Sequence, residues 1–221
     1  GAVRDTIEYV RGIIEIEINA ATDNPLLFEE DLALSGGNFH GEPIGMVMDF
    51  LGIAITELGA ISERRVFRLT DGKLNGGLPP MLVDSMDAAG LNSGLMMPQY
   101  TCVSLVLENQ TLATPDSVHS LPTSGEQEDH NANSMTAARH TQRIIQNTTH
   151  ILAVELFTAT RAIDLRMRMM PEAHLGKVTQ DLHDRIRQIV PYQAGDIWWE
   201  PCIDELRMWI LQESWLELLR P

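Results

Sequence analysis

Apolar residues recur every three or four positions along most of this chain, which is the spacing that gives an α-helix one buried face. The spacing predicts six helices, at about residues 7–18, 44–65, 95–112, 134–165, 175–189 and 203–219. Ser134 is a residue type that caps helix N-termini, so it is expected to open the fourth helix. No stretch alternates with the period of two that marks a strand. The pattern therefore predicts an all-α fold, a bundle of long helices.

The connections between these helices carry the turn-forming residues. Gly72–Pro80 and Ser85–Gly94 are rich in glycine, proline, aspartate and asparagine, and we expect loops there around a short extended piece at Met81–Val83. Residues 114–133 form a connection of about twenty residues, a length that is uncommon in a compact domain unless the loop has a function. Near the end of the chain, Trp198 and Trp199 are expected to anchor the packing.

Two loop windows concentrate side chains that bind ligands. The first reads Ser35-Gly-Gly-Asn-Phe-His-Gly-Glu-Pro43, and the second reads Leu121-Pro-Thr-Ser-Gly-Glu-Gln-Glu-Asp-His130. The glycines suit tight turns or close backbone approaches, and an amide, an aromatic ring, an imidazole and carboxylates follow them. Taken without its neighbours, the acidic cluster of the second window is also typical of a solvated surface loop. His130 and Glu128 do not have a zinc-site spacing, so no metal is expected.

Charge and cysteine content narrow the classes of function. The 221 residues are 44% hydrophobic and 21% charged, with a formal net charge of −15. This charge argues against partners such as nucleic acids and anionic membranes. Cys102 and Cys202 are far apart and are expected to be reduced and buried. No apolar run is expected to span a bilayer and no leader opens the chain, so the expected location is cytoplasmic.

A series of short motifs resembles the aromatic amino acid ammonia-lyases that use a methylidene-imidazolone electrophile. The family includes histidine, phenylalanine and tyrosine ammonia-lyases and related aminomutases, and the likeness is to the histidine enzymes. The motifs are Thr22-Asp-Asn-Pro25, Ser35 to Pro43, Ser62-Glu-Arg-Arg65, Leu78-Pro-Pro80, Leu91-Asn-Ser-Gly94, Pro122-Thr-Ser124 and Gln127-Glu-Asp-His130. They lie within residues 1–166, the expected C-terminal part of the lyase core, and residues 167–221 are expected to extend the same domain.

The resemblance assigns roles to residues of both windows. Phe39 corresponds to the aromatic ring beside the electrophile and the substrate ring, and Asn38 and His40 flank it as further substrate-binding candidates. Glu128 corresponds to the position that faces the substrate and is the candidate catalytic residue. A carboxylate there goes with the histidine enzymes, and it can accept a strong hydrogen bond from an imidazole N–H or an ammonium group. The resemblance gives Gln127 and His130 a supporting role, in which they hold the loop.

The family implies more than these residues supply. Its electrophile forms from an Ala-Ser-Gly tripeptide, which this sequence does not contain, so the group is expected in an N-terminal part that is missing here. The implied reaction is elimination of ammonia from L-histidine to give trans-urocanate, in a homotetramer with a core of long helices. A phenylalanine or tyrosine lyase or an aminomutase is the alternative enzyme, because Thr70-Asp-Gly-Lys-Leu-Asn75 is also similar to the tyrosine enzymes. A catalytically silent helical fragment or assembly subunit is the alternative of another class, and we expect this chain alone to be inactive.

Overall fold

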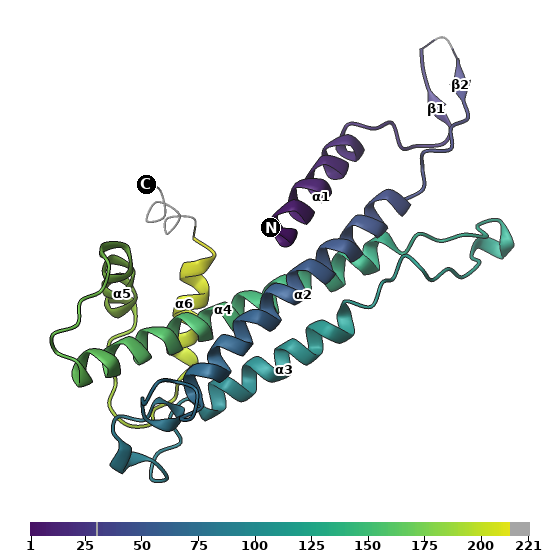
Figure 1. Ribbon diagram of the computed structural model, residues 1–221. Helices are drawn as coiled ribbons and strands as arrows, with labels where there is room; N and C mark the ends of the chain where they lie inside the picture. The colour runs from purple at the N-terminus through teal and green to yellow at the C-terminus, as the bar shows by residue number, and fades with distance from the viewer. Residues whose placement is uncertain (30, 213–221) are drawn as a thin grey trace. The chain divides into compact units, whose positions relative to one another are not determined.

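The computed structural model describes residues 1–29 and 31–212, and helices dominate them. The helices are α1 (Ala2–Ile18), α2 (Glu42–Thr70), α3 (Met96–Leu112), α4 (Ser134–Met169), α5 (Lys177–Ile189) and α6 (Glu200–Ile210). Three short 3-10 turns lie at Pro80–Leu82, Met86–Ala88 and Ser124–Glu126. Figure 1 shows how much longer α2 and α4 are than the rest. The predicted all-α class is confirmed.

Three local predictions are corrected. Strands β1 (Leu26–Leu27) and β2 (Ala33–Leu34) pair antiparallel, Leu26 with Leu34 and Leu27 with Ala33, where the sequence predicted no strand. The segment expected to be extended at Met81–Val83 is largely a 3-10 turn. Trp199 is buried as expected, but Trp198 is 76% exposed. The last part of the helix expected at 203–219 lies outside the described residues.

Helix α2 continues past the charged motif that was expected to end it. Thr70 closes the helix, and its hydroxyl donates to the carbonyls of Val66 and Phe67. The charged residues before it are held by partners within the protein. Arg65 binds Glu155 of α4, with Nη2 at 2.8 Å from Oε2, and this hydrogen bond raises the pKa of the guanidinium group. Glutamate and arginine are good helix formers, so this charged turn does not end the helix.

Contacts divide the chain into two units that interleave along the sequence. Unit 1 comprises Gly1–Leu58 and Glu108–Ile145, and unit 2 comprises Gly59–Leu107 and Gln146–Pro221. Neither unit is a continuous stretch of chain, and the boundary expected between residues 166 and 167 stays a prediction.

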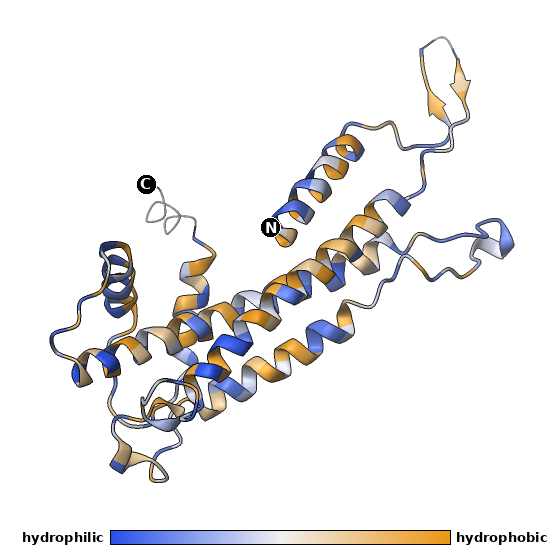
Figure 2. Cartoon of the chain, viewed as in Figure 1, coloured by the Kyte–Doolittle hydropathy of each residue, from blue (hydrophilic) through white to orange (hydrophobic). Residues whose placement is uncertain are grey.

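Unit 1 leaves much of its apolar surface uncovered. Val10, Val47 and Ile144 are buried, while Ile18 is 75% exposed and Met46 58% exposed. Other exposed large apolar residues on α1 and on the unit 1 part of α2 include Ile7, Tyr9, Ile16, Phe50 and Ile53. Figure 2 shows hydrophobic residues along both α1 and α2. Apolar side chains on these two helices are therefore exposed within unit 1.

Helix α2 is the one described helix that is long and apolar enough, by composition alone, to cross a membrane, which differs from the sequence expectation. It also carries buried acidic groups with partners inside the protein. Asp49 accepts a hydrogen bond from the N–H of Ser117, and Glu63 accepts one from Arg64. A core helix of a helical bundle has the same composition.

Unit 2 has a continuous hydrophobic core. Its buried members come from α2 to α6 and from the connections between them: Val66, Leu78, Leu82, Leu95, Cys102, Val106, Ile151, Ala153, Val154, Phe157, Ala162, Leu165, Ile186, Val190, Trp199, Ile203 and Leu206. Burial raises the pKa of the Cys102 thiol to about 12. Both cysteines are free, as expected, but Cys202 is only partly buried.

A buried arginine ties three segments of unit 2 together. The side chain of Arg161, on α4, is 2% exposed and donates to the carbonyls of Leu82 (2.7 Å) and Gln193 (2.8 Å). Its Nη2 lies 3.3 Å from the carboxylate of Asp84. Asp84 also accepts hydrogen bonds from the Tyr192 hydroxyl and the Gly195 N–H. The segment before α6 is therefore fastened to α4 and to the loop after α2.

The Asp84 carboxylate should make stability depend on pH. Burial opposes its ionisation, but the hydrogen bonds from Tyr192 and Gly195 and the nearby arginines outweigh burial and lower its pKa. A lowered folded-state pKa means that the stabilisation is present above the unfolded value near 3.9 and is lost as pH falls through the folded value. We expect Asp84→Asn to cost more stability at pH 6 than at pH 3, measured by urea unfolding. A difference that is equal at the two pH values would contradict this assignment.

Candidate functional site

The two loop windows meet in unit 1 through a pair of histidines. Nε2 of His40 lies 3.1 Å from the backbone carbonyl oxygen of His130. The two imidazole rings stack, with their centroids 5.4 Å apart. The backbone N–H of Glu42 donates to Nδ1 of His40 at 3.3 Å. Because Nδ1 accepts and Nε2 faces a carbonyl, the geometry selects the neutral ring with its proton on Nε2. His40 thus joins two loops that are ninety residues apart in sequence.

Asn24 fixes the start of the first loop. Its side-chain oxygen accepts hydrogen bonds from the Ser35 hydroxyl and the Gly36 N–H, each at 3.1 Å. Asn24 precedes β1, and Ser35 follows β2, so the hairpin brings the two ends together. The asparagine side chain therefore sets where the Gly-Gly-Asn-Phe-His segment leaves the hairpin.

Two polar side chains fix the ends of the second loop. Asp49 of α2 accepts a hydrogen bond from the N–H of Ser117 at 2.8 Å. The Asn133 amide donates to the carbonyls of Asp116 (3.3 Å) and His119 (2.6 Å). Asn133 itself has φ +52°, a left-handed conformation that asparagine tolerates better than most residues. These contacts hold the base of the loop against α2 and the start of α4.

Glycines allow the start of α2 to approach the end of the second loop. A Cβ on Gly41 would lie 2.6 Å from the Ser134 hydroxyl, and one on Gly45 would lie 2.9 Å from the carbonyl oxygen of Ala132. The second contact is with backbone, which cannot rotate away as a side chain can. Only glycine at position 45 fits this spacing without a shift of the loop.

Substituting Gly45 should therefore destabilise the site where substituting Gly37 does not. Because no atom lies within 4 Å of a Cβ built on Gly37, we expect Gly37→Ala to be nearly neutral. We expect Gly45→Ala to lower the free energy of unfolding by about 1–3 kcal/mol, the usual cost of overpacking. Urea unfolding of both variants tests this prediction. Equal free energies of unfolding would show that the loop at Ala132 can move to accommodate the added Cβ without loss of stability.

Glu128 lies on a tight turn of the second loop. The N–H of Thr123 donates to the carbonyl of Glu128 at 2.8 Å, and the N–H of Glu128 donates back to Thr123 at 3.3 Å. Between them, Ser124 and Glu126 have φ of +53° and +70°, which is strained for residues other than glycine. The Glu128 residue is exposed, and its carboxylate has no hydrogen bond or ion pair with any residue that the structure describes.

The other residues singled out from the sequence occupy different positions around this junction. Phe39 is 50% exposed, and Asn38 and Gln127 are also exposed. His130 lies with Nε2 at 4.0 Å from Oε2 of Glu42, an oxygen that is buried and has no hydrogen-bond partner among the described residues. The contacts that join the loops are made by His40 and His130, whereas Phe39 and Glu128 take no part in them. Both are free to face a bound molecule.

Sequence reasoning gave no separate role to Asn24, Asp49 or Asn133, which position the loops. Asn24 had a signal, since it lies in one of the motifs that carry the family resemblance. Asp49 had another, because it is an acidic residue within an apolar helix pattern. The residues that the structure describes contain no group of three or more His, Cys, Asp or Glu side chains that could hold a metal.

Known proteins match this chain in sequence and in structure. A sequence model of the aromatic amino acid lyases matches residues 1–188. A histidine ammonia-lyase of Treponema denticola is 51% identical over 193 residues, which are 82% of this chain and 38% of that protein. The crystal structure of histidine ammonia-lyase from Trypanosoma cruzi has a TM-score of 0.89 at 35% identity, covering 99% of this chain and 42% of that one.

The structure of tyrosine aminomutase from Streptomyces globisporus gives the same TM-score and identity, over 99% of this chain and 40% of that one. The chain thus spans about two fifths of the length of these proteins. The helical fold of this chain agrees with these matches. This chain belongs to the aromatic amino acid lyase family.

Proposed function

We propose that this chain forms the C-terminal portion of an ammonia-lyase that converts L-histidine to trans-urocanate. One observation carries the proposal: His40 and His130 join the loop of Phe39 to the loop of Glu128 within one unit. An aromatic ring and a free carboxylate then stand on neighbouring loops. The 51% identity to the Treponema denticola histidine ammonia-lyase supports histidine as the substrate.

Glu128 and Phe39 would act directly on the substrate. The Glu128 carboxylate is exposed and unpaired among the described residues, so it can accept a hydrogen bond from the substrate's ammonium or imidazole N–H. In that position it can also take or return a proton during elimination. The half-exposed ring of Phe39 can pack against the imidazole of the substrate. Asn38 is a further candidate for binding the substrate.

His40 and His130 would position these groups. Both nitrogens of the His40 ring are engaged by backbone, to Glu42 and to His130, which leaves the ring edge no free hydrogen-bonding atom for a substrate. Gln127 lies next to Glu128 and would support the same turn. Although the sequence made His40 a substrate-binding candidate, its contacts suit a role in holding the loops.

The family uses a methylidene-imidazolone group, which makes the substrate's weakly acidic β-proton removable. We propose that polypeptide outside these 221 residues supplies it, because the sequence holds no Ala-Ser-Gly tripeptide. The residues present fit such a group. Phe39 and Glu128 are exposed and engaged by no described side chain, so they can line a site that another segment completes.

The assembled enzyme would be a cytoplasmic homotetramer. The observation in favour of assembly is the uncovered apolar surface of unit 1, in particular Ile16, Ile18 and Met46. Large exposed apolar areas mark surfaces that bind other proteins. Further copies of the chain, together with the N-terminal part of the enzyme, would cover these residues.

Tyrosine aminomutase activity is the second candidate. The Streptomyces globisporus tyrosine aminomutase has the same TM-score and identity to this chain as the Trypanosoma cruzi histidine enzyme. The fold alone therefore supports both chemistries equally. Phenylalanine or tyrosine lyase activity belongs to the same alternative.

One experiment tests the proposal and its alternatives together. The protein is purified under native conditions, and every chain that co-elutes is identified by intact mass. The sample is then given L-histidine or L-tyrosine, and the products are separated by chromatography. We expect trans-urocanate from histidine when a second chain carrying the electrophile is present. A rearranged or deaminated product from tyrosine alone would favour the second candidate, and no product from a sample that holds both chains would favour a silent assembly subunit.

A further inference from the structure

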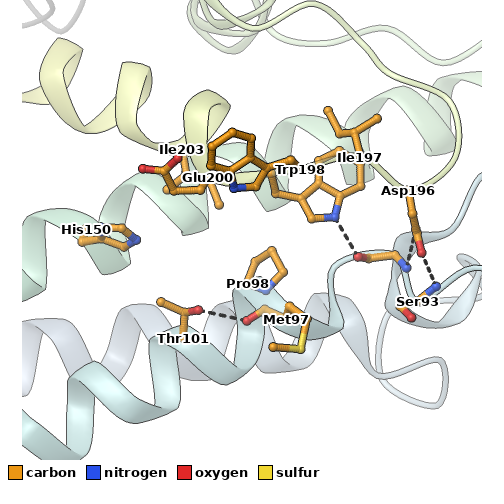
Figure 3. A pocket seen from close by; sticks show the side chains of 12 residues that line it. Ser93, Met97, Pro98, Thr101, His150, Asp196, Ile197, Trp198, Glu200 and Ile203 are labelled. Atoms are coloured by element: carbon orange, nitrogen blue, oxygen red, sulfur yellow. Dashed lines mark hydrogen bonds between the residues drawn. The ribbon is translucent and has the colours of Figure 1, made fainter.

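Unit 2 contains a pocket that takes no part in the junction of the two loops. Its volume is about 480 Å³, which is within the usual range for sites that hold a small molecule. The first turns of α3, the middle of α4 and the segment from Asp196 to Ile203 form its walls. Figure 3 shows these three segments around one space.

Hydrogen bonds hold the walls in place without a ligand. The buried indole of Trp199 donates to the carbonyl of Gly94 at 3.1 Å. The Asp196 carboxylate accepts hydrogen bonds from the N–H groups of Ser93 (2.6 Å) and Gly94 (2.9 Å). The segment before α6 is thus pinned to the start of α3 at two points. The pocket is a formed feature of the fold.

The pocket presents an exposed aromatic surface, the indole of Trp198. Trp198 is 76% exposed, and Met97, across the pocket, is 60% exposed. Pro98 adds an apolar ring between them (Figure 3). A planar ring can stack on the indole of Trp198 with its edges against Met97 and Pro98. This surface fits an aromatic ligand.

The polar groups at one end of the pocket favour a positive charge. Figure 3 shows Glu200 beside the ring of Trp198, and His150 of α4 at the same end of the pocket. Burial, with the charge of Arg207, lowers the pKa of His150 although Asp204 and Glu200 oppose the shift, and this favours the neutral imidazole, which can accept a hydrogen bond. Neither His150 nor Glu200 has a hydrogen bond or ion pair with another side chain that the structure describes. The Thr101 hydroxyl is already bonded to the carbonyl of Met97.

We propose that this pocket binds a small arylalkylamine, with its ring on Trp198 and its ammonium group between Glu200 and His150. The ammonium would pair with the Glu200 carboxylate and donate a hydrogen bond to the His150 ring. Its charge would also be attracted to the face of the Trp198 indole. The net charge of −15 on the chain favours a cation and opposes an anion of the same shape.

A charge series of three probes tests the proposal. The probes are 2-phenylethylamine, 2-phenylethanol and phenylacetate, which carry similar rings and differ in charge. Binding is measured by ligand-observed NMR titration. We expect the amine to bind about fivefold more tightly than the alcohol, from its cation–π and charge contacts, and the acid to bind most weakly. Equal affinities across the series, or no binding of the amine, would overturn the proposal.

Variants locate the binding. Trp198→Ala should weaken binding of the amine roughly tenfold, the value of an aromatic contact, and its exposure means that the fold is retained. Glu200→Gln should remove the preference for the amine over the alcohol. The matched controls are Tyr100→Ala, an exposed aromatic on α3, and Glu205→Gln, an exposed carboxylate on α6, neither of which lines the pocket. Loss of the preference in Glu205→Gln but not in Glu200→Gln would refute the assignment.

Discussion

Replacing Arg161 by methionine should lower the free energy of unfolding by about 3 kcal/mol, the cost of removing one partner from a buried ion pair. The guanidinium is 2% exposed and makes hydrogen bonds to the carbonyls of Leu82 and Gln193, besides its pairing with Asp84. Methionine keeps an unbranched apolar stem but donates no hydrogen bond. The two carbonyls would lose their donor, and the Asp84 carboxylate would lose its closest cation.

The matched control for this prediction is Arg139→Met. Arg139 is exposed on the same helix, α4, and no ion pair or hydrogen bond joins it to another described residue. We expect this control to change stability by less than about 0.5 kcal/mol, as is usual for surface sites. Urea unfolding measures both variants. If Arg161→Met cost no more than Arg139→Met, the arginine would not be the tie between α4 and the segment before α6.

The helices could be predicted because their apolar periodicity is local. On α4, Ile151, Val154 and Phe157 are spaced by three residues and are all buried. Arg161 continues the same face four residues later, so a buried arginine was signalled by a charge at a core position. Its partners could not be predicted, because Leu82 and Asp84 lie almost eighty residues earlier in the chain.

Features that depend on a few residues or on tertiary contacts were missed. The β1–β2 hairpin has two residues in each strand, too few to produce an alternating pattern. The end of α2 was expected at Arg65, where the apolar pattern gives way to a charged motif. The helix instead continues to Thr70, and Arg65 pairs with Glu155 of α4.

The candidate site was predicted in composition but not in geometry. The two windows were recognised from their glycines and functional side chains, which are local features. The contact between His40 and His130 joins residues ninety positions apart, so it follows from the fold and not from either window alone. The neighbouring tryptophans give the same lesson, since Trp199 is 7% exposed and Trp198 is 76% exposed. Both residues are tryptophans that could pack in the core, and the path of the backbone determines that only Trp199 is buried there.

Replacing Glu128 by glutamine should reduce turnover of L-histidine by roughly 100-fold or more in the complete enzyme, the usual contribution of a group that moves a proton. Glutamine keeps the shape and can still accept a hydrogen bond, but it has no charge to pair with an ammonium group and cannot take a proton. The residue is exposed on its turn, so the change should leave the fold intact. Turnover of L-tyrosine should not fall in the same variant, because the tyrosine enzymes of the family tend to carry an amide at the matching position.

The control for this prediction is Glu126→Gln, two residues away on the same turn. It changes the same charge in the same loop, so it separates a specific role of Glu128 from a general effect of the acidic cluster. Rates of urocanate formation and of tyrosine consumption are measured for both variants at saturating substrate. Equal losses of turnover in the two variants would show that Glu128 has no specific role and that the acidic cluster is a solvated surface loop. A large loss confined to Glu128→Gln and to histidine would assign this carboxylate to the substrate, and with it the choice of histidine over tyrosine.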